Sequence, residues 1–441
     1  MKFLATRLEG LLIAAFLATC LGLFWPPDGY FAKGLALAGE SSPYHAAAFG
    51  GLTILLAVGC LARLPQIPPL LLAGWPVLVL AAFSMLSAFW SDAPFLTVRR
   101  SATLAETAVF GIYLLARYDV PQIVAVLSKL CLIGALASLV MIAAFPDLAY
   151  AHNYTHIDSW RGAFPDKNTL GAVATVGIIV SAYAFRHGYV WRPLAALGVA
   201  ANLATLYLAD SKTPEVALVA ACYVAALCSM RRRRDGIGLT VAFAMTVIGL
   251  AGIAIIALAP DDVMTVLNRS PTLSSRTKIW ELALIFVDRY PWLGYGYGAF
   301  FRIGGVEVGQ MQAIMQWPVP STHNAWLEQA LGLGWVGVGL IGFVCLIAFH
   351  RLARATTLPQ QSHAPLLGAL LAALLMETLT ESSFLTPGDS IWVLFVVCVT
   401  ALGRELSAYR GNAARGRAPG TLSVLIGTPA PTLAFPNGSR G

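Results

Sequence analysis

The chain contains the stretch Ser321-Thr322-His323-Asn324-Ala325-Trp326-Leu327-Glu328, followed by Gly334-Trp335-Val336-Gly337, where a polar loop gives way to an apolar run. The loop covers about residues 260–322 and holds several cations, and the apolar run covers about 323–348. A run of this length suits a helix that crosses a hydrocarbon core of ~30 Å. This boundary therefore predicts a membrane helix with a long polar loop at its mouth.

The composition extends this reading to the whole chain. Of 441 residues, 58% are hydrophobic and 12% are charged, and the mean hydropathy is +0.71, which exceeds what a soluble domain can use. We predict an all-α, polytopic membrane bundle over residues 1–403 and a disordered, cytoplasmic tail over 404–441. The twelve predicted spans are about 8–25, 44–62, 68–90, 100–116, 122–145, 168–185, 193–209, 214–230, 237–259, 323–348, 365–383 and 388–403.

The cysteines, the basic residues and the first apolar segment argue against a disulfide-bonded or zinc-binding protein, a nucleic-acid module and a cleaved signal peptide. All seven cysteines fall inside apolar runs, so we expect neither disulfides nor a zinc site, and no metal or cofactor. The net charge of +7 is spread over helix ends, unlike the clustered cations of a nucleic-acid module. The first apolar segment follows Lys2 and Arg7 like a signal peptide, but no small-x-small cleavage site follows it. We expect it to be an uncleaved first helix.

The basic residues also predict the orientation in the membrane. Seventeen of them, including the run Arg231–Arg234, fall in segments that would share one side with the N-terminus. By the positive-inside rule this side is cytoplasmic, and loops of ~60 residues escape the rule. We expect both termini in the cytoplasm, the 260–322 loop in the periplasm, and anionic membrane lipids as partners of the arginine run.

Several cations lie on the predicted outer side, against this rule. Arg161 and Lys167 flank a turn before the sixth span, where Asp166 or Asn168 can cap the helix. Cations at a helix start oppose the dipole, so an anion that binds there would explain them. Lys212, in the short turn before the eighth span, could join the same pocket. The alternative is an ordinary basic loop on the membrane surface.

The long loop contains a predicted amphipathic helix over about 275–288, with Arg276 and Lys278 in its first turn and Trp280 on its apolar face. An arginine fork can bind two phosphate oxygens at once. The glycines and aromatic residues of 290–297 have the composition of a sugar-stacking surface. Interfacial aromatic anchors are an equally good reading of that segment.

His323 is the candidate general base, because an imidazole suits proton transfer near neutral pH. Asn324 can cap the tenth helix, and together with Trp280 and Lys278 it is a candidate for binding the diphosphate or the glycan. Glu328, just over one turn further, could orient the ring of His323. Glu377 and Glu381, near the outer end of the eleventh span, could instead pair with a loop arginine. Acidic groups inside a membrane are costly and are functional candidates by default.

These residues together resemble the O-antigen ligase and polymerase family of bacterial membrane glycosyltransferases. The resemblance rests on Ser275-Arg276, on Pro291-Trp292-Leu293-Gly294-Tyr295-Gly296, and on His323-Asn324 followed at fixed spacing by Gly334 and Gly337. It covers about residues 200–400. The segment Trp160-Arg161-Gly162-x-Phe164-Pro165-x-Lys167-Asn168-Thr169-Leu170-Gly171 looks like the exopolysaccharide-polymerase version and extends the match toward residue 160.

The resemblance implies transfer of a glycan from undecaprenyl diphosphate to an acceptor sugar hydroxyl, in lipid A core or in another lipid-linked repeat, at the periplasmic face of the inner membrane. It implies no nucleotide sugar and no obligatory metal. His323 would take the acceptor proton, and Arg276 and Arg161 would neutralise the leaving diphosphate. Where many members have Ser-Arg at the eighth span, this chain has Ser211-Lys212, which loses the bidentate fork.

Two other classes remain open at this stage. A flippase or transporter of lipid-linked sugars would suit twelve spans, but its charges would be expected in a midplane cavity. A non-catalytic scaffold would associate with polysaccharide assembly proteins, which are also possible partners of an enzyme. A scaffold has no need for a histidine and cations at one face.

Overall fold

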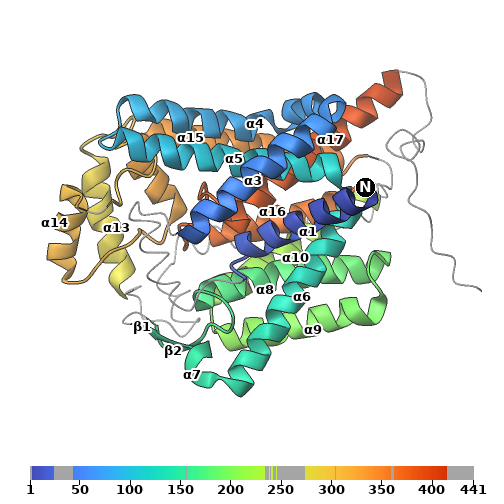
Figure 1. The fold of residues 1–441 in the computed structure, drawn as a ribbon, viewed down its shortest axis with the longest axis horizontal. Helices are drawn as coiled ribbons and strands as arrows, with labels where there is room; N and C mark the ends of the chain where they lie inside the picture. Colours follow the sequence, from blue (N-terminus) through green and yellow to red (C-terminus); the bar gives the residue numbers. More distant parts are fainter. Residues whose placement is uncertain are drawn as a thin grey trace, which may run out of the picture.

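The computed structural model describes residues 2–23, 43–153, 156–233 and 274–414, except 303 and 359–361, and also describes a few single positions between 238 and 245. The fold is predominantly helical. Figure 1 shows most helices running in one direction, with α13 and α14 at one end of the molecule.

The described elements follow the chain in this order: α1 (Lys2–Cys20), α3 (Pro43–Ala62), η1 (Leu64–Gln66), α4 (Ile67–Leu86), η2 (Ser87–Phe89), α5 (Pro94–Arg117), α6 (Val120–Ala144), α7 (Pro146–Ala149), β1 (Tyr150–Asn153), β2 (His156–Trp160), α8 (Lys167–His187), α9 (Arg192–Ala209), α10 (Lys212–Arg233), α13 (Ser274–Val287), α14 (Val306–Met315), α15 (Ala325–Ala355), α16 (Ala364–Glu377) and α17 (Ser390–Ala414).

Eleven of the twelve predicted spans correspond to a described helix, and the ninth, 237–259, lies largely outside the described residues. Seven helical stretches of the described chain are long and apolar enough to cross a membrane. They begin at η1, α6, α8, α9, α10, α15 and α17. The chain is therefore a multi-pass membrane protein, while the count of twelve remains a prediction.

Several helix boundaries differ from the prediction by five residues or more. α1 ends at Cys20, and α16 ends at Glu377, six residues before the predicted end of its span, because residues 378–389 form an irregular loop. α17 continues to Ala414, beyond the predicted domain boundary at 403.

The helix caps are as expected: Asp166 accepts a hydrogen bond from the Thr169 N–H at 2.8 Å, and Asn324 accepts one from the Leu327 N–H at 3.0 Å.

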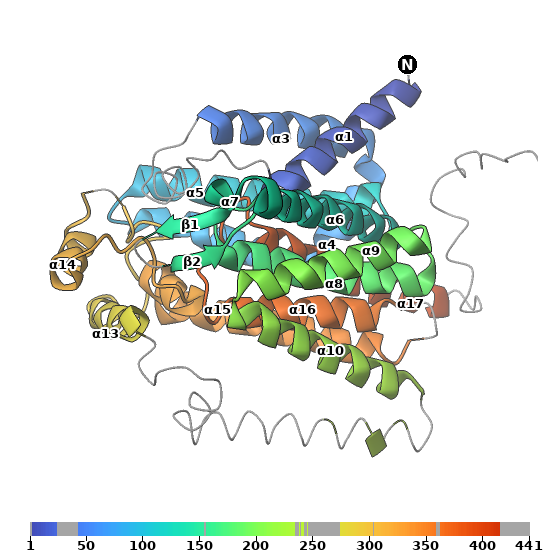
Figure 2. The same ribbon diagram turned by 90° about the horizontal axis from the view of Figure 1, so that it is seen from below.

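One short sheet departs from the all-α prediction. β1 and β2 pair antiparallel, with Tyr150 opposite Trp160, in the loop before α8. Figure 2 shows this pair at the same end of the molecule as α13 and α14. Figure 1 agrees, so the end that bears the long loops gathers segments that are far apart in the sequence.

The glycine and aromatic segment of the long loop fits into a break in α15. Gly334 has φ 65° and ψ −172°, which interrupts the helix. The carbonyl of Leu331 and the N–H of Trp335, which an unbroken helix would pair, bind instead to the Tyr295 N–H and to the carbonyl of Pro291, both at 2.8 Å. A Cβ on Gly334 would lie 2.2 Å from the Trp292 carbonyl group, so only glycine fits.

The insertion shows which aromatic residues of segment 290–297 are packed inside the protein and which are exposed to a possible sugar. Tyr295 and Tyr297 are buried, and the Trp90 indole donates to the carbonyl of Leu293 at 2.9 Å. Further bonds to Ser87 of η2, Thr97 of α5 and Leu331 of α15 hold the loop in place. Tyr290 and Trp292 remain exposed, at 55% and 69%.

α17 forms the centre of the bundle and packs against α4, α5, α15 and α16. Trp392, Phe395 and the preceding Phe384 are fully buried and contact one another through their rings. This core fixes the position of the loop between α16 and α17, which leads to the candidate site.

Candidate active site

The loop that follows α16 joins the segments predicted to form the site. The carbonyl of Thr378 accepts a hydrogen bond from the Ala325 N–H at 3.0 Å, and that of Leu379 accepts one from Asn324 Nδ2 at 3.1 Å. The carbonyl of Thr380 accepts from Arg276 Nη1 at 2.8 Å. These contacts tie the start of α15 and the start of α13 to the end of α16.

Glu381 is the centre of this loop. Its Oε1 lies 3.1 Å from Arg276 Nη2 and accepts a hydrogen bond from Asn168 Nδ2 at 2.7 Å, while its Oε2 lies 3.6 Å from His323 Nδ1. Burial alone would raise the pKa of Glu381, but His323, followed by Arg276, lowers that pKa below its ordinary value. The carboxylate is therefore ionised at neutral pH and faces two basic side chains.

His323 occupies a strained position just before α15. Its φ is 50°, in the left-handed region that few non-glycine residues adopt. Its side chain is 25% exposed, and among the described residues its ring accepts or donates no hydrogen bond shorter than the 3.6 Å approach to Glu381. Nδ1 faces the carboxylate, and Nε2 is the ring nitrogen on the other side.

Arg276 stands in the first turn of α13 with its side chain 22% exposed. Two of its N–H groups bind Thr380 and Glu381, and within the described residues its other three donors have no hydrogen-bond partner. This arrangement confirms the expected pairing of a loop arginine with Glu381. Glu377 is buried, and neither of its carboxylate oxygens has a hydrogen-bond partner within the described part of the chain.

The starts of α8 and α10 adjoin the same loop. Ser211 Oγ donates to Asn168 Oδ1 at 2.9 Å, and the hydroxyls of Thr213 and Thr380 lie 2.7 Å apart. Lys167 Nζ donates to the carbonyl of Asp210 at 3.4 Å. Asn168, which bonds to both Ser211 and Glu381, thus connects the starts of α8 and α10 to this loop.

Lys212 is placed less favourably for an anion. Its Nζ lies 3.1 Å from Glu215 and 3.5 Å from Asp210, and its side chain is 46% exposed. Two carboxylates therefore already balance its charge. The prediction that Lys212 binds diphosphate remains a prediction.

Two other predicted cations make no contact with Glu381. Both Nε and Nη2 of Arg161 donate to the carbonyl of Leu148, at 3.2 Å and 3.1 Å, at the base of the strand pair. Lys278 is exposed on α13, next to the buried Ile279. Their roles as diphosphate ligands likewise remain predictions.

Trp280 and Glu328 support the backbone on which His323 sits. The Trp280 indole donates to the carbonyl of Thr322 at 2.8 Å. Glu328 accepts from the Thr322 N–H at 3.4 Å and from the Thr322 hydroxyl at 3.3 Å. The carboxylate at ion-pair distance from the imidazole is therefore Glu381, whereas Glu328 was the residue expected to orient the ring.

Sequence reasoning missed the central place of Glu381 and the linking role of Asn168. The signal for Glu381 was present, since an acidic residue at the outer end of a span faced an excess of outer arginines. Nothing in the sequence indicates that Asn168 would bond to it across the bundle. Among the described residues, no three His, Cys, Asp or Glu side chains are grouped closely enough to hold a metal ion.

Comparisons with known proteins bear on this arrangement. Residues 197–347 match the family described as O-antigen ligase. The exopolysaccharide production protein ExoQ of Rhizobium meliloti is 25% identical over 320 residues, which cover 69% of this chain and 71% of that protein. An uncharacterized protein of Haemophilus influenzae is 36% identical over 94 residues, 20% of this chain and 22% of that protein. The resemblance predicted from the sequence is confirmed.

Proposed function

We propose that this chain, whose resemblance to the O-antigen ligases extends over residues 197–347, is a membrane glycosyltransferase. It transfers a glycan from undecaprenyl diphosphate to a sugar hydroxyl at the periplasmic face of the bacterial inner membrane. The relative named for exopolysaccharide production supports a role in polysaccharide assembly. The observation that carries the proposal is the placement of Glu381 between His323 and Arg276.

In the proposed reaction, His323 Nε2 accepts the proton of the acceptor hydroxyl. The acceptor oxygen forms a bond to the anomeric carbon of the donor glycan, and the bond from that carbon to the diphosphate oxygen breaks. Glu381 holds Nδ1 and stabilises the imidazolium that forms. The proton then leaves to solvent through the partly exposed ring.

Arg276 stabilises the charge that the leaving diphosphate gains. Its remaining N–H groups are held in place by the bonds to Thr380 and Glu381, so little side-chain entropy is lost when the anion binds. Lys167 and Arg161 add positive charge at the same end of the molecule, whereas Glu215 and Asp210 already balance that of Lys212. The cations of the chain thus supply the charge stabilisation that the proposed step requires.

The test is a reconstitution of purified protein with lipid-linked oligosaccharide in proteoliposomes. The proposed enzyme produces a longer or transferred glycan and releases undecaprenyl diphosphate. A transporter would produce translocated lipid with unchanged glycan, and a scaffold would produce neither change. Either of the last two results with a well-folded protein would overturn the proposal.

A further inference from the structure

A chain of side-chain contacts runs from the start of α10, through α8, to the candidate base. Ser211 Oγ donates to Asn168 Oδ1 at 2.9 Å, and Asn168 Nδ2 donates to Glu381 Oε1 at 2.7 Å. The other carboxylate oxygen, Oε2, lies 3.6 Å from His323 Nδ1. Ser211 is 6% exposed and the Glu381 side chain 19% exposed, so water competes little for these contacts.

The contacts give the side-chain amide of Asn168 a defined orientation. An amide carries an acceptor oxygen at one end and a donor nitrogen at the other, whereas an ionised carboxylate only accepts. The donor end must therefore face Glu381. The oxygen end then faces Ser211, whose hydroxyl can donate to it. Ser211 thus favours the orientation in which Asn168 donates to the carboxylate.

The amide also decides how Glu381 is turned. An arginine fork can bind both oxygens of a carboxylate, a pose that would compete with the approach of Oε2 to His323. Here Arg276 Nη1 donates to the carbonyl of Thr380 at 2.8 Å, and only Nη2 contacts Glu381, at Oε1. Asn168 donates to the same Oε1. Oε1 therefore has two donors, and Oε2 remains for the imidazole.

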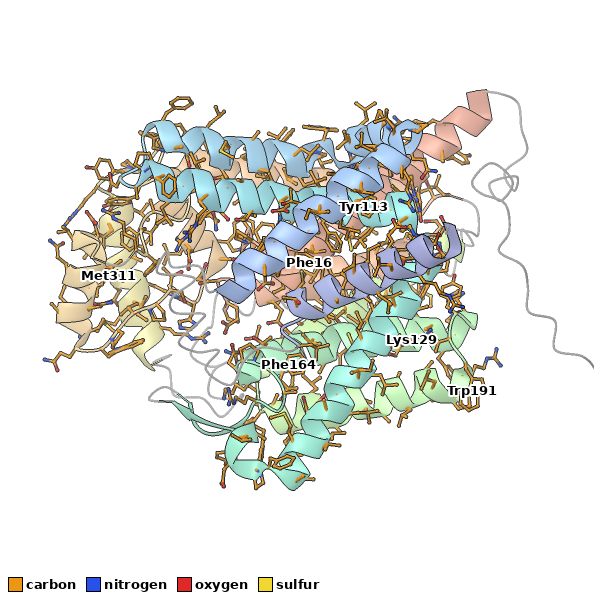
Figure 3. The ribbon with its side chains drawn as sticks, in the orientation of Figure 1. Phe16, Tyr113, Lys129, Phe164, Trp191 and Met311 are labelled. Atoms are coloured by element: carbon orange, nitrogen blue, oxygen red, sulfur yellow. The ribbon has the colours of Figure 1, made fainter. Side chains whose placement is uncertain are left out.

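The start of α8 is held in place without the Asn168 side chain. Asp166 caps the helix, and the turn before it is packed into the bundle by Phe164, which is 3% exposed and is labelled in Figure 3. A Cβ on Gly134 of α6 would lie 2.9 Å from the Phe164 ring, which shows how closely this turn packs. The amide of Asn168 is thus required neither as a cap nor as a packing group.

The contact between α8 and α10 is likewise satisfied by other residues. Thr175 Oγ1 donates to the carbonyl of Pro214 at 3.0 Å, in the interior of the bundle. A Cβ on Gly171 would lie 2.7 Å from the Pro214 ring, so the two helices approach closely at this level. This approach brings Ser211 within reach of Asn168, and the amide is left to serve Glu381.

We propose that Asn168, oriented by Ser211, is a positioning residue that acts on His323 through Glu381. With Oε1 held by the amide, Oε2 stays opposite Nδ1 and favours the neutral imidazole that carries its hydrogen on Nδ1. Nε2 then has a free lone pair for the proton of the acceptor hydroxyl. The inference rests on the proposed function, because only a proton acceptor requires this tautomer.

The direct test is ¹⁵N solid-state NMR of the full chain, labelled at histidine, in bilayers at alkaline pH, where histidine side chains are neutral. The His323 signals are those lost in His323→Gln. We expect the hydrogen mainly on Nδ1. Asn168→Leu, which has nearly the same shape, should lower the ratio of the two tautomers about tenfold, the value of one hydrogen bond to a charged group. Thr175→Val removes a hydrogen bond between the same two helices, away from Glu381, and should leave the ratio unchanged.

Turnover with lipid-linked oligosaccharide supplies the second readout. Asn168→Leu should lower kcat about tenfold and leave KM nearly unchanged, because Arg276 still binds the donor. Combined with Glu381→Gln, it should cause no further loss, since the amide acts through that carboxylate. Ser211→Ala should lower kcat about threefold, and Ser211→Thr, which keeps the hydroxyl, should restore it. A full additional tenfold loss in the double variant would overturn the proposal.

The tautomer ratio gives further outcomes that decide the question. An unchanged ratio in Asn168→Leu would overturn the proposal, and so would an equal decrease in Thr175→Val, which would indicate general loosening of α8 against α10. If Asn168→Leu fails to fold, Ser211→Ala gives the same comparison with the loss of one hydroxyl. A wild-type chain that transfers no glycan, but whose ratio depends on Asn168, would contradict the proposed function and support the positioning.

Discussion

Two carboxylates hold opposite ends of this molecule in a similar way. At the end of the molecule where α1 begins, Glu9 lies 2.8 Å from Arg63 and 3.1 Å from Arg117, and the Tyr113 hydroxyl donates to it. At the other end, Glu381 joins Arg276, Asn168 and His323. Each carboxylate links elements that are distant in the sequence, and each is mostly buried.

The difference between them lies in one partner. The two arginines lie at closed ion-pair distance from Glu9, and these contacts hold α1 against α3 and α5. At Glu381 one partner is an imidazole, and the 3.6 Å between its Nδ1 and the Glu381 carboxylate is longer than a closed hydrogen bond. The imidazole is therefore held more loosely by Glu381 than the two arginines are held by Glu9.

The largest expected effect tests this partner directly. His323→Ala should lower turnover by ~10²–10⁴-fold, because it removes the positioned proton acceptor. Donor binding should persist through Arg276. Turnover measured with lipid-linked oligosaccharide checks this, and His350→Ala, an exposed histidine at the opposite end of the same α15, is the control.

The pH dependence of activity distinguishes a general base from a cationic phosphate ligand at His323. For a base, activity falls at acid pH, because a protonated ring cannot accept a proton. For a cationic phosphate ligand, acid pH would increase activity and His323→Arg would remain active. An active His323→Arg enzyme would contradict the base assignment.

The two arginine sites should respond differently to a conservative change. Arg276→Lys keeps the charge but loses the fork, so we expect turnover to fall roughly 10–100-fold, the value of one strong charge-assisted hydrogen bond. Arg63→Lys should lower the Tm and leave the turnover of folded protein unchanged. Parallel assays of turnover and unfolding check both. Normal turnover in Arg276→Lys would remove this residue from the site.

Replacing each carboxylate by a neutral amide should have a smaller effect than the arginine substitutions. Glu381→Gln should lower turnover about tenfold and move the acid limb of its pH profile to lower pH, because an amide does not stabilise the imidazolium. Glu9→Gln should lower the free energy of unfolding by about 1–3 kcal/mol without changing the pH profile. The comparison fails if Glu9→Gln shifts the acid limb and Glu381→Gln does not.

The smallest expected effect is the pH dependence of stability. The pKa of Glu381 is lower in the folded protein than its ordinary value of 4.5. Its contribution to stability is therefore complete above that value and is lost as the pH falls through the lower, folded value. Thermal unfolding at acid pH should show a steeper loss of Tm in the wild-type chain than in Glu381→Gln. Identical slopes would argue against an ionised Glu381 in the folded state.

The sequence predicts where helices form better than it predicts which residues of distant elements contact one another. Apolar runs and caps such as Asp166 and Asn324 place most helices within a few residues, because these signals are local. The end of α16 at Glu377 and the break at Gly334 depend on partners far along the chain, namely Arg276 and the segment 291–297. No local pattern encodes such pairings.

The same limit applies to the candidate site. His323 and Arg276 stand out by residue type and position, and the structure brings both to Glu381. The choice of Glu381 over Glu328 as the neighbour of the imidazole depends on how the loop after α16 folds back. Glu328 is closer to His323 in sequence, but its hydrogen bonds go to Thr322.

The shortness of α16 has a consequence for how substrates arrive. Its fourteen residues extend about 21 Å, less than the ~30 Å of hydrocarbon that a spanning helix covers. With the start of α16 at one interface, the loop that carries Glu381 begins about 9 Å short of the opposite edge of the hydrocarbon layer. A polyprenyl carrier could then reach the loop by diffusing sideways in the leaflet. Its search would be two-dimensional, so the supply of donor would depend on its density per area of membrane and on lipid viscosity.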